Sequence, residues 1–129
     1  MKARNYFLWT LLGACAALTA FTFSKSESVR HVVVFKFKPT ATKQQIDEVT
    51  NAFRNLKNKI PGIQSFEHGA NMSPEKKDLG FNHVYLITFE NEAARDAYLP
   101  HQDHNAFGQL LGKLSVLDDV FVVDFVSEN

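Results

Sequence analysis

The stretch VRHVVVFKFK, residues 29–38, decides the fold class because its alternating pattern predicts a β-strand. Alternate residues of a strand point to opposite faces of a sheet. One face carries His31, Val33, Phe35 and Phe37, and the other carries Arg30, Val32, Val34, Lys36 and Lys38. Both faces are apolar in the middle, so we expect helices to cover one side of this strand and another surface to cover the other.

The residues that follow predict the element order β-α-β-β-α-β. Thr42 and Gln45 have the spacing of a capping box at a helix start, and Pro61-Gly62 ends the apolar stripe behind it. Further strands are predicted at residues 63–70, 82–90 and 116–126, and helical segments on both sides of Pro100 separate the last two. The final strand is almost continuously apolar, so we expect it to be buried. This order is the ferredoxin-like split βαβ, an α+β fold with an antiparallel sheet.

Such a sheet has helices on one face and leaves its other face open. We assign to the open face the aromatic and aliphatic residues Phe35, Phe37, Tyr85, Ile87 and Phe89. This is too much apolar surface to leave in water. We therefore expect a homodimer in which two sheets pair to form an α/β barrel.

Composition and charge exclude several classes of function. The chain has 129 residues, which suits one domain. Lys+Arg and Asp+Glu both number 14, so the net charge is zero and gives no electrostatic reason to expect nucleic-acid binding. The single cysteine, Cys15, cannot form an intrachain disulfide. The sequence has no phosphate loop, nucleotide fingerprint or serine-nucleophile motif.

Residues 1–28 are predicted to be a targeting segment outside the domain, which spans residues 29–129. A short positive start precedes an uncharged, mostly apolar run from Tyr6 to Phe23, and a polar exit follows. This is the pattern of a secretory signal or a signal anchor. We therefore expect an exported protein, in the periplasm or cell envelope, that meets the membrane only through this segment.

Three fates of the segment remain open. Cleavage after Ala20 or Ser24 would release a soluble domain, whereas an uncleaved segment would anchor the domain outside the cytoplasm. The third fate is a lipoprotein, because Leu12-Gly13-Ala14-Cys15 resembles a bacterial lipobox in which Cys15 is lipidated.

Several stretches of the domain together resemble the stress-responsive α/β-barrel (Dabb) domain family. They are residues 30–38, 60–63, 82–84, 88–90, 98–104 and 122–125. The resemblance implies a homodimer with a cavity between sheet and helices in each subunit. It also implies that most relatives have no assigned reaction, while a few plant members are polyketide cyclases that perform aldol chemistry without metal or organic cofactor.

The resemblance also implies a site. In the plant cyclase members, the equivalents of Tyr98 and His104 are the catalytic pair, and the equivalents of His31 and His83 lie in the same cavity. We accordingly expect His104 and Tyr98 to be catalytic, and His31, His83, Phe35 and Phe89 to contact substrate.

Each of these residues also has a structural interpretation. His31 and His83 would then cap a carbonyl, pair with a carboxylate or contact the dimer partner, and Tyr98 would be a core aromatic residue. His101 and His104 have the spacing to cap the helix that follows them. We assign no chemistry to His68.

The proposed chemistry is consistent with these residue types. A neutral imidazole can remove a proton next to a carbonyl near neutral pH, and a tyrosine hydroxyl can donate to the enolate oxygen. A metal site is the rival chemistry, with three ligands from His31, His83, His101 and His104. No cysteine of the domain and no HExxH motif accompanies these histidines, so we expect neither a metal nor another cofactor.

Three functions follow, in order of preference. The first is a binding module that holds a small apolar or aromatic molecule in a cavity of each subunit. The second is a cofactor-independent cyclase or lyase acting on a carbonyl substrate through the His/Tyr pair, and the third is a non-catalytic structural stress protein. Export counts against polyketide cyclisation, because acyl-thioester precursors are cytoplasmic. The sequence leaves open whether the protein is an enzyme.

Overall fold

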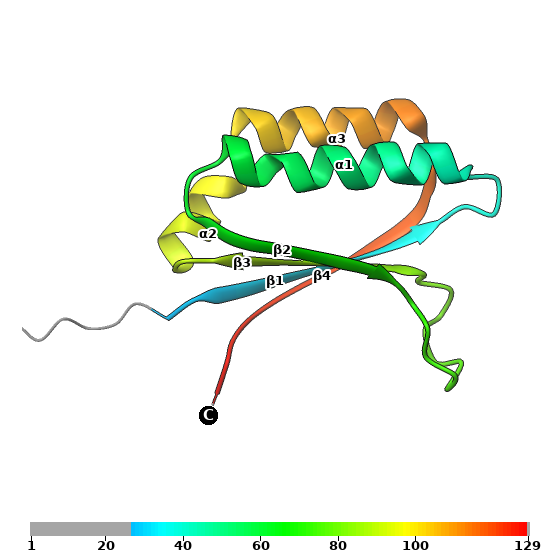
Figure 1. The fold of residues 1–129 in the computed structure, drawn as a ribbon, viewed down its shortest axis with the longest axis horizontal. Helices are drawn as coiled ribbons and strands as arrows, with labels where there is room; N and C mark the ends of the chain where they lie inside the picture. The colour runs from blue at the N-terminus through cyan, green and yellow to red at the C-terminus, as the bar shows by residue number, and fades with distance from the viewer. Residues whose placement is uncertain (1–26, 129) are drawn as a thin grey trace, which may run out of the picture.

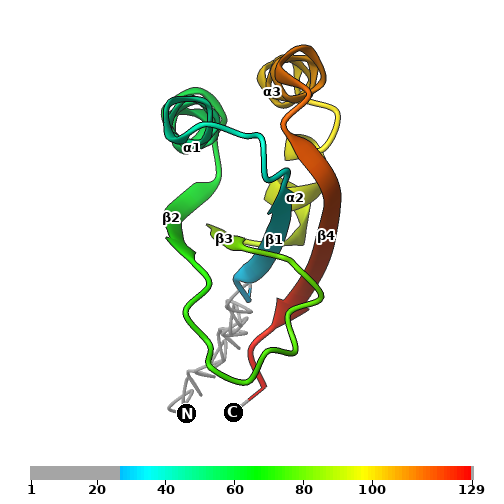
Figure 2. The same ribbon diagram turned by 90° about the vertical axis from the view of Figure 1, so that its right-hand side faces the viewer.

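A computed structural model describes residues 27–128 of the chain and places seven elements in them (Figure 1). In chain order they are β1 (Val29–Phe37), α1 (Lys43–Lys59), β2 (Ile63–Ala70), β3 (His83–Phe89), α2 (Glu92–Tyr98), α3 (Gln102–Leu114) and β4 (Leu117–Val126). The strands form one antiparallel sheet in the order β2-β3-β1-β4, and α1 and α3 lie side by side over one face of it (Figure 2). The predicted ferredoxin-like α+β fold is confirmed.

The predictions for the N-terminal segment fall almost entirely outside the described residues. The signal, anchor and lipobox interpretations concern residues 1–26, and these stay predictions. Across residues 27–128, no helix combines the length and the apolar character needed to cross a membrane.

Side-chain caps and one glycine position the helices. The capping box predicted at α1 is present: the Thr42 side chain accepts a hydrogen bond from the Gln45 amide, and Gln45 accepts one from the Thr42 amide. Asn91 caps α2 by accepting from the Ala94 amide at 2.8 Å. Gly62 has φ of +86°, and a Cβ there would lie 2.5 Å from the Cβ of Ala94. Only glycine therefore lets α2 pack this closely against the start of β2.

The assignment of the two sheet faces was wrong. His31, Val33, Phe35 and Phe37 of β1 are buried in one core with Phe53 of α1, so this face lies under the helices. Tyr85, Ile87 and Phe89 of β3 belong to the same core. Alternation shows which residues share a face, but not which face the helices cover. Here the helices cover the more aromatic face, which buries more apolar area.

The open face, opposite the helices, is nevertheless apolar. The strand register places there Val32, Val34, Val84, Leu86, Phe121, Val123 and Phe125. A homodimer that pairs two open faces is therefore still expected, and it would bury these residues in place of Phe35, Phe37, Tyr85, Ile87 and Phe89.

The prediction that the last strand is buried was also wrong. β4 lies at the edge of the sheet and pairs only with β1. Val120 and Val122, on the helix side, are 49% and 50% exposed, and Phe121 and Val123, on the open face, are 51% and 45% exposed. A continuous apolar run is typical of a strand that is covered on both faces, and one chain alone does not supply that cover for an edge strand.

Candidate functional site

Three aromatic rings meet on the helix-covered face of the sheet, at one of its ends. His31, near the start of β1, is 5% exposed. Its ring lies edge-on to Phe89 at the end of β3 and to Tyr98 at the end of α2, with centroid distances of 5.9 and 5.8 Å. Phe89 and Tyr98 are themselves 5.0 Å apart. The sheet and α2 thus bring one imidazole and one phenol into a shared apolar environment.

Tyr98 is fully buried, and its hydroxyl is not bonded to any other described residue. Burial raises the pKa of this hydroxyl, because the phenolate would lose its hydration. The group is therefore a hydrogen-bond donor throughout the physiological pH range. A buried polar atom without a protein partner is costly and uncommon. Such a hydroxyl is suited to donate to an oxygen of a bound molecule.

His104, in the first turn of α3, packs its ring against the ring of Tyr98. The ring centroids of Tyr98 and His104 are 4.2 Å apart, with an angle of 34° between the planes. Nδ1 of His104 lies 2.9 Å from the carbonyl oxygen of Leu99. A carbonyl only accepts, so Nδ1 donates, and in the neutral ring Nε2 is left as the basic nitrogen.

The turn between α2 and α3 explains why Tyr98 and His104 face each other. Pro100 cannot continue the hydrogen-bond ladder of α2. His101 then caps α3 by accepting from the Asp103 amide at 3.2 Å, which confirms one of the two roles predicted for it. The pair is therefore brought together within one short segment.

Asp124 of β4 holds His31 from the other side. Nδ1 of His31 donates to Oδ1 of Asp124 at 2.6 Å. Burial lowers the pKa of His31 more than this carboxylate raises it, so the ring is neutral at neutral pH and Nε2 carries its free lone pair. The second oxygen of Asp124 accepts a hydrogen bond from Arg95 of α2.

The sequence interpretation gave no role to Asp124 or Arg95. Asp124 had a visible signal, because it is the one acidic residue of the apolar run 120–126 and has the strand parity of Val122. Arg95 gave none, since it lies on a short polar helix among other charged residues.

His83 does not join this cluster. It pairs in register with Phe35, whereas His31 pairs with Ile87. The two positions are four residue steps apart along the strand, which is about 13 Å at about 3.3 Å per residue. His83 instead packs against Phe37, with a centroid distance of 5.1 Å. The expectation that His31, His83, Tyr98 and His104 share one cavity is therefore wrong for His83.

His83 has an environment of its own. Its Nδ1 is buried without a partner in residues 27–128. Burial lowers the pKa of the ring, and His68 adds a smaller effect in the same direction. His68 is exposed and bonds to Arg54 through Nε2 at 2.7 Å. The substrate-binding role of His83 stays a prediction.

Aromatic rings fill the middle of the layer between the sheet and the helices. Phe35 packs 5.1 Å from Tyr85 and 6.0 Å from Phe53, and Phe53 stacks on Phe107 at 4.5 Å. Phe35 is thus placed in the hydrophobic core, away from the Tyr98 ring. Phe89 is the predicted lining residue that does contact the cluster.

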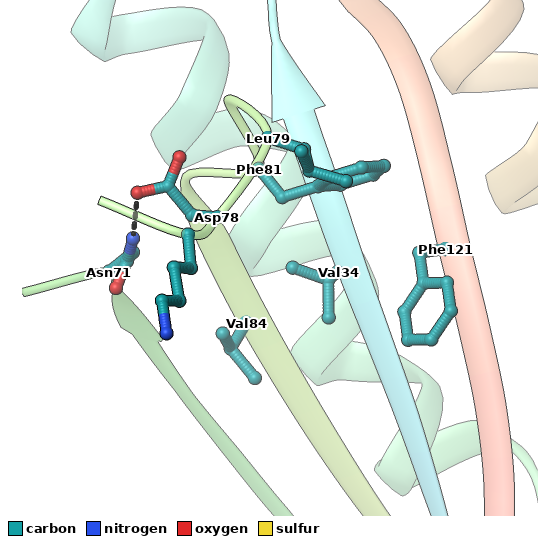
Figure 3. Close-up of a pocket in the computed structure, with 8 residues that line it drawn as sticks. Val34, Asn71, Asp78, Leu79, Phe81, Val84 and Phe121 are labelled. Atoms are coloured by element: carbon teal, nitrogen blue, oxygen red, sulfur yellow. Dashed lines mark hydrogen bonds between the residues drawn. The ribbon is translucent and has the colours of Figure 1, made fainter. Parts of the chain in front are cut away.

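A cavity of about 390 Å³ opens on the other side of the sheet (Figure 3). Val34, Val84 and Phe121 of the open face line it from the strands. Leu79 and Phe81 line it from the β2–β3 loop, where Asn71 donates to Asp78 at 2.9 Å. The residues of the His31 cluster do not line this cavity, which lies on the face where we expect the second subunit.

The described part of the chain gathers no three His, Cys, Asp or Glu side chains in a way that could hold a metal ion. His83 and His31 lie at opposite ends of the sheet, and His101 is engaged in capping α3. The four histidines considered as ligands are therefore not brought together.

Comparisons with known proteins match the whole domain. The sequence model of the family described as the stress responsive A/B barrel domain (Dabb) matches residues 29–127. The stress-response A/B barrel domain-containing protein HS1 of Arabidopsis thaliana is 32% identical over 97 residues, which are 75% of this chain and 87% of that protein. Olivetolic acid cyclase of Cannabis sativa is 31% identical over 83 residues, 64% of this chain and 82% of the cyclase.

Solved structures share the fold. The Arabidopsis thaliana protein At3g17210 has a TM-score of 0.73 and 31% identity, covering 78% of this chain and 96% of its own. A dimeric ferredoxin-like protein from Jannaschia sp. CCS1 has a TM-score of 0.66 and 28% identity, covering 78% and 99%. Hydroxynitrile lyase from Passiflora edulis has a TM-score of 0.71 at 24% identity, covering 79% and 94%; it resembles this chain in fold.

Proposed function

This chain belongs to the stress-responsive A/B barrel domain family, and from that premise we propose that it is a cofactor-independent enzyme acting on a carbonyl compound. The observation that carries the proposal is the buried Tyr98 hydroxyl, which has no partner among the described residues and belongs to a ring that packs against the His104 ring. Olivetolic acid cyclase is a relative whose name states a cyclisation. The proposed reaction class is a lyase or cyclase reaction that begins with removal of a proton next to a carbonyl.

Each residue of the pair has one task in this step. Nε2 of His104 takes the proton from the carbon next to the carbonyl. The electron pair of that C–H bond forms a double bond to the carbonyl carbon, and the π pair of the carbonyl moves onto its oxygen to give an enolate. The Tyr98 hydroxyl donates a hydrogen bond to that oxygen and stabilises the developing negative charge. The hydrogen bond from Nδ1 of His104 to Leu99 keeps the imidazole in the tautomer that can act as a base.

His31 supports the same step from the sheet. Its lowered pKa keeps it neutral, so it does not place a second positive charge against His104 when His104 takes up the proton. Because Asp124 engages Nδ1, the Nε2 of His31 is the nitrogen available to a substrate. We assign His31 and Phe89 to substrate contact and leave Phe35 in the core.

A second candidate function is binding without chemistry. Aromatic rings pack against the Tyr98 ring, and its hydroxyl has no partner among the described residues, which suits an apolar or aromatic molecule with one hydrogen-bond acceptor. Export of the protein also remains a proposal, supported by the signal-like composition of residues 1–28.

We further propose that the protein works as a homodimer joined through the open face. Val84, Phe121, Val123 and Phe125 are 37–51% exposed there, which is a large apolar surface for a protein in water. Relatives of this fold from Jannaschia sp. CCS1 and Thermobifida fusca are dimeric. Pairing of two such faces would bury these residues and the cavity beside Phe121.

The enzyme proposal is tested by proton exchange, which does not require the natural substrate. The full-length protein is incubated in D₂O with a panel of β-keto acids and β-diketones of different size, and deuterium incorporation next to the carbonyl is followed by NMR. We expect catalysed exchange with at least one compound and its loss in His104→Gln and Tyr98→Phe.

His68→Gln is the matched control, because His68 is an exposed histidine outside the cluster. Exchange that persists in His104→Gln would reject His104 as the base. Binding of a panel compound, detected by perturbed Tyr98 and His104 signals without any exchange, would favour the second candidate.

A further inference from the structure

The Asp124 carboxylate joins three elements of the fold. It sits on the edge strand β4, its Oδ1 accepts from His31 of β1 at 2.6 Å, and its Oδ2 accepts from Arg95 of α2. Both oxygens therefore have a charged or strongly polar donor. The Asp124 side chain is 25% exposed and that of Arg95 is 21% exposed, while His31 is nearly inaccessible at 6%.

We propose that Arg95 is a positioning residue for His31, because it holds one oxygen of Asp124 and thereby fixes the other on Nδ1 of His31. The consequence is a single imidazole tautomer with Nε2 available to the site. This role rests on the proposed function, in which His31 contacts the substrate.

The need for such a residue follows from where Asp124 lies. A carboxylate on an exposed edge strand can rotate toward water, which offers its oxygens hydrogen bonds without holding the side chain in one rotamer. Arg95 removes that freedom, since a guanidinium presents several N–H donors in a rigid plane. Two-point fixation of the carboxylate then determines which nitrogen of His31 carries the proton.

Arg95 also links the position of His31 to that of Tyr98. The two residues lie three apart on α2, on neighbouring turns of one helical face. An ion pair from Arg95 to β4 therefore fixes the same helix whose last residue supplies the proposed oxyanion donor.

The other charged groups around His31 are accounted for. Asp124 faces it from β4, His104 from α3, and Arg95 from α2. Asp96 contacts Arg95 at 2.8 Å, but its side chain is 66% exposed and makes no bond to His31. Asp96 is thus a matched control: it is a second carboxylate on the same guanidinium, outside the path from Arg95 to His31.

The experiment measures the tautomer of His31 directly. The full-length protein is labelled with ¹⁵N, and the imidazole nitrogen shifts of His31 are recorded at about pH 8, where its lowered pKa keeps this ring neutral. The signals are assigned by their loss in His31→Asn. We expect the Nδ1-protonated form in the wild type and in Asp96→Asn, and a shift toward the Nε2-protonated form in Arg95→Met and Arg95→Gln.

Both Arg95→Met and Arg95→Gln are measured so that a folding defect in one variant leaves the other for the test. Circular dichroism reports whether each variant is folded. A folded Arg95 variant that keeps the wild-type tautomer would overturn the proposal. A loss of the Nδ1-protonated form in Asp96→Asn equal to that in Arg95→Met would also overturn it.

The exchange assay separates this inference from the proposed function. A tautomer shift in Arg95→Met, with no exchange activity in any protein, would leave the positioning role standing and reject the enzyme. Exchange in the wild type that is lost in Tyr98→Phe and His104→Gln, together with an unchanged His31 tautomer in the Arg95 variants, would support the enzyme and reject the positioning role.

Discussion

Tyr98→Phe should stabilise the protein while it abolishes proton exchange. The substitution removes one hydroxyl that is fully buried and has no hydrogen-bond partner in the described chain, and it leaves the ring packing against Phe89 and His31 unchanged. A buried polar group left unsatisfied costs about 1–3 kcal/mol. We therefore expect the free energy of unfolding to rise by about 1 kcal/mol or more, the lower end allowing for partial relief by water.

Tyr85→Phe is the matched comparison, because Tyr85 is also fully buried and its hydroxyl is bonded to Thr50 Oγ1 at 2.8 Å. Removing this hydroxyl breaks a hydrogen bond and leaves Thr50 without that partner, so the free energy of unfolding should fall by about 1 kcal/mol. Two substitutions of the same chemistry are thus expected to have opposite signs.

The assay is urea unfolding of both variants and the wild type at one protein concentration, because the stability of a dimer depends on concentration. Thermal melts offer a second readout, with about 4–8 °C expected per kcal/mol for a domain of this size. A Tyr98→Phe protein that is destabilised as much as Tyr85→Phe would refute the reasoning. It would mean that the Tyr98 hydroxyl has a stabilising partner and is a structural group.

Three further predictions concern pH, assembly and domain boundaries. Burial holds the pKa of His31 below the value of about 6.5 in an unfolded chain. The contribution of His31 to the free energy of unfolding should therefore be complete above that pH and decrease as the pH is lowered. In urea titrations between about pH 8 and about pH 5, His31→Asn should lose less stability than the wild type. Phe121→Glu on the open face should convert the dimer to a monomer in sedimentation equilibrium, whereas Val122→Glu, equally exposed on the helix side, should leave it dimeric. Deleting residues 1–28 should leave a domain with an unchanged melting temperature, and a deletion variant that aggregates would place the segment in the fold. Lipid labelling that disappears in Cys15→Ala would identify the lipoprotein among the three fates.

The elements of the fold could be predicted because their signals are local. The capping box of Thr42 and Gln45, and the turns at Gly62 and Pro100, each depend on neighbours within a few residues. The orientation of the sheet could not be predicted in the same way. β1 is apolar on both faces, so the choice between them depends on which set packs better under α1 and α3, and that is decided by residues far away in the sequence.

The burial of the edge strand β4 could not be predicted from its sequence either. Val120 to Val123 are continuously apolar, a pattern that a strand buried within one chain shares with a strand that a second chain covers. Strand order decides between these cases, and the pattern of one strand does not contain it. The error about the burial of β4 therefore arises because cover within one chain and cover by a second chain give the same sequence pattern.

In the candidate site, too, contacts that are local in the sequence could be predicted and contacts between distant strands could not. Tyr98 and His104 meet because a single turn at Pro100 joins their helices, so their spacing in the sequence already implied their proximity. His31 and Asp124 are separated by 93 residues and meet only through the pairing of β1 with β4. His83 has the right parity but the wrong position along β3, which depends on register. The proximity of two residues joined by a short turn can thus be predicted from the sequence. The residues that orient them cannot, because orientation comes from contacts between strands and helices that are distant in the sequence.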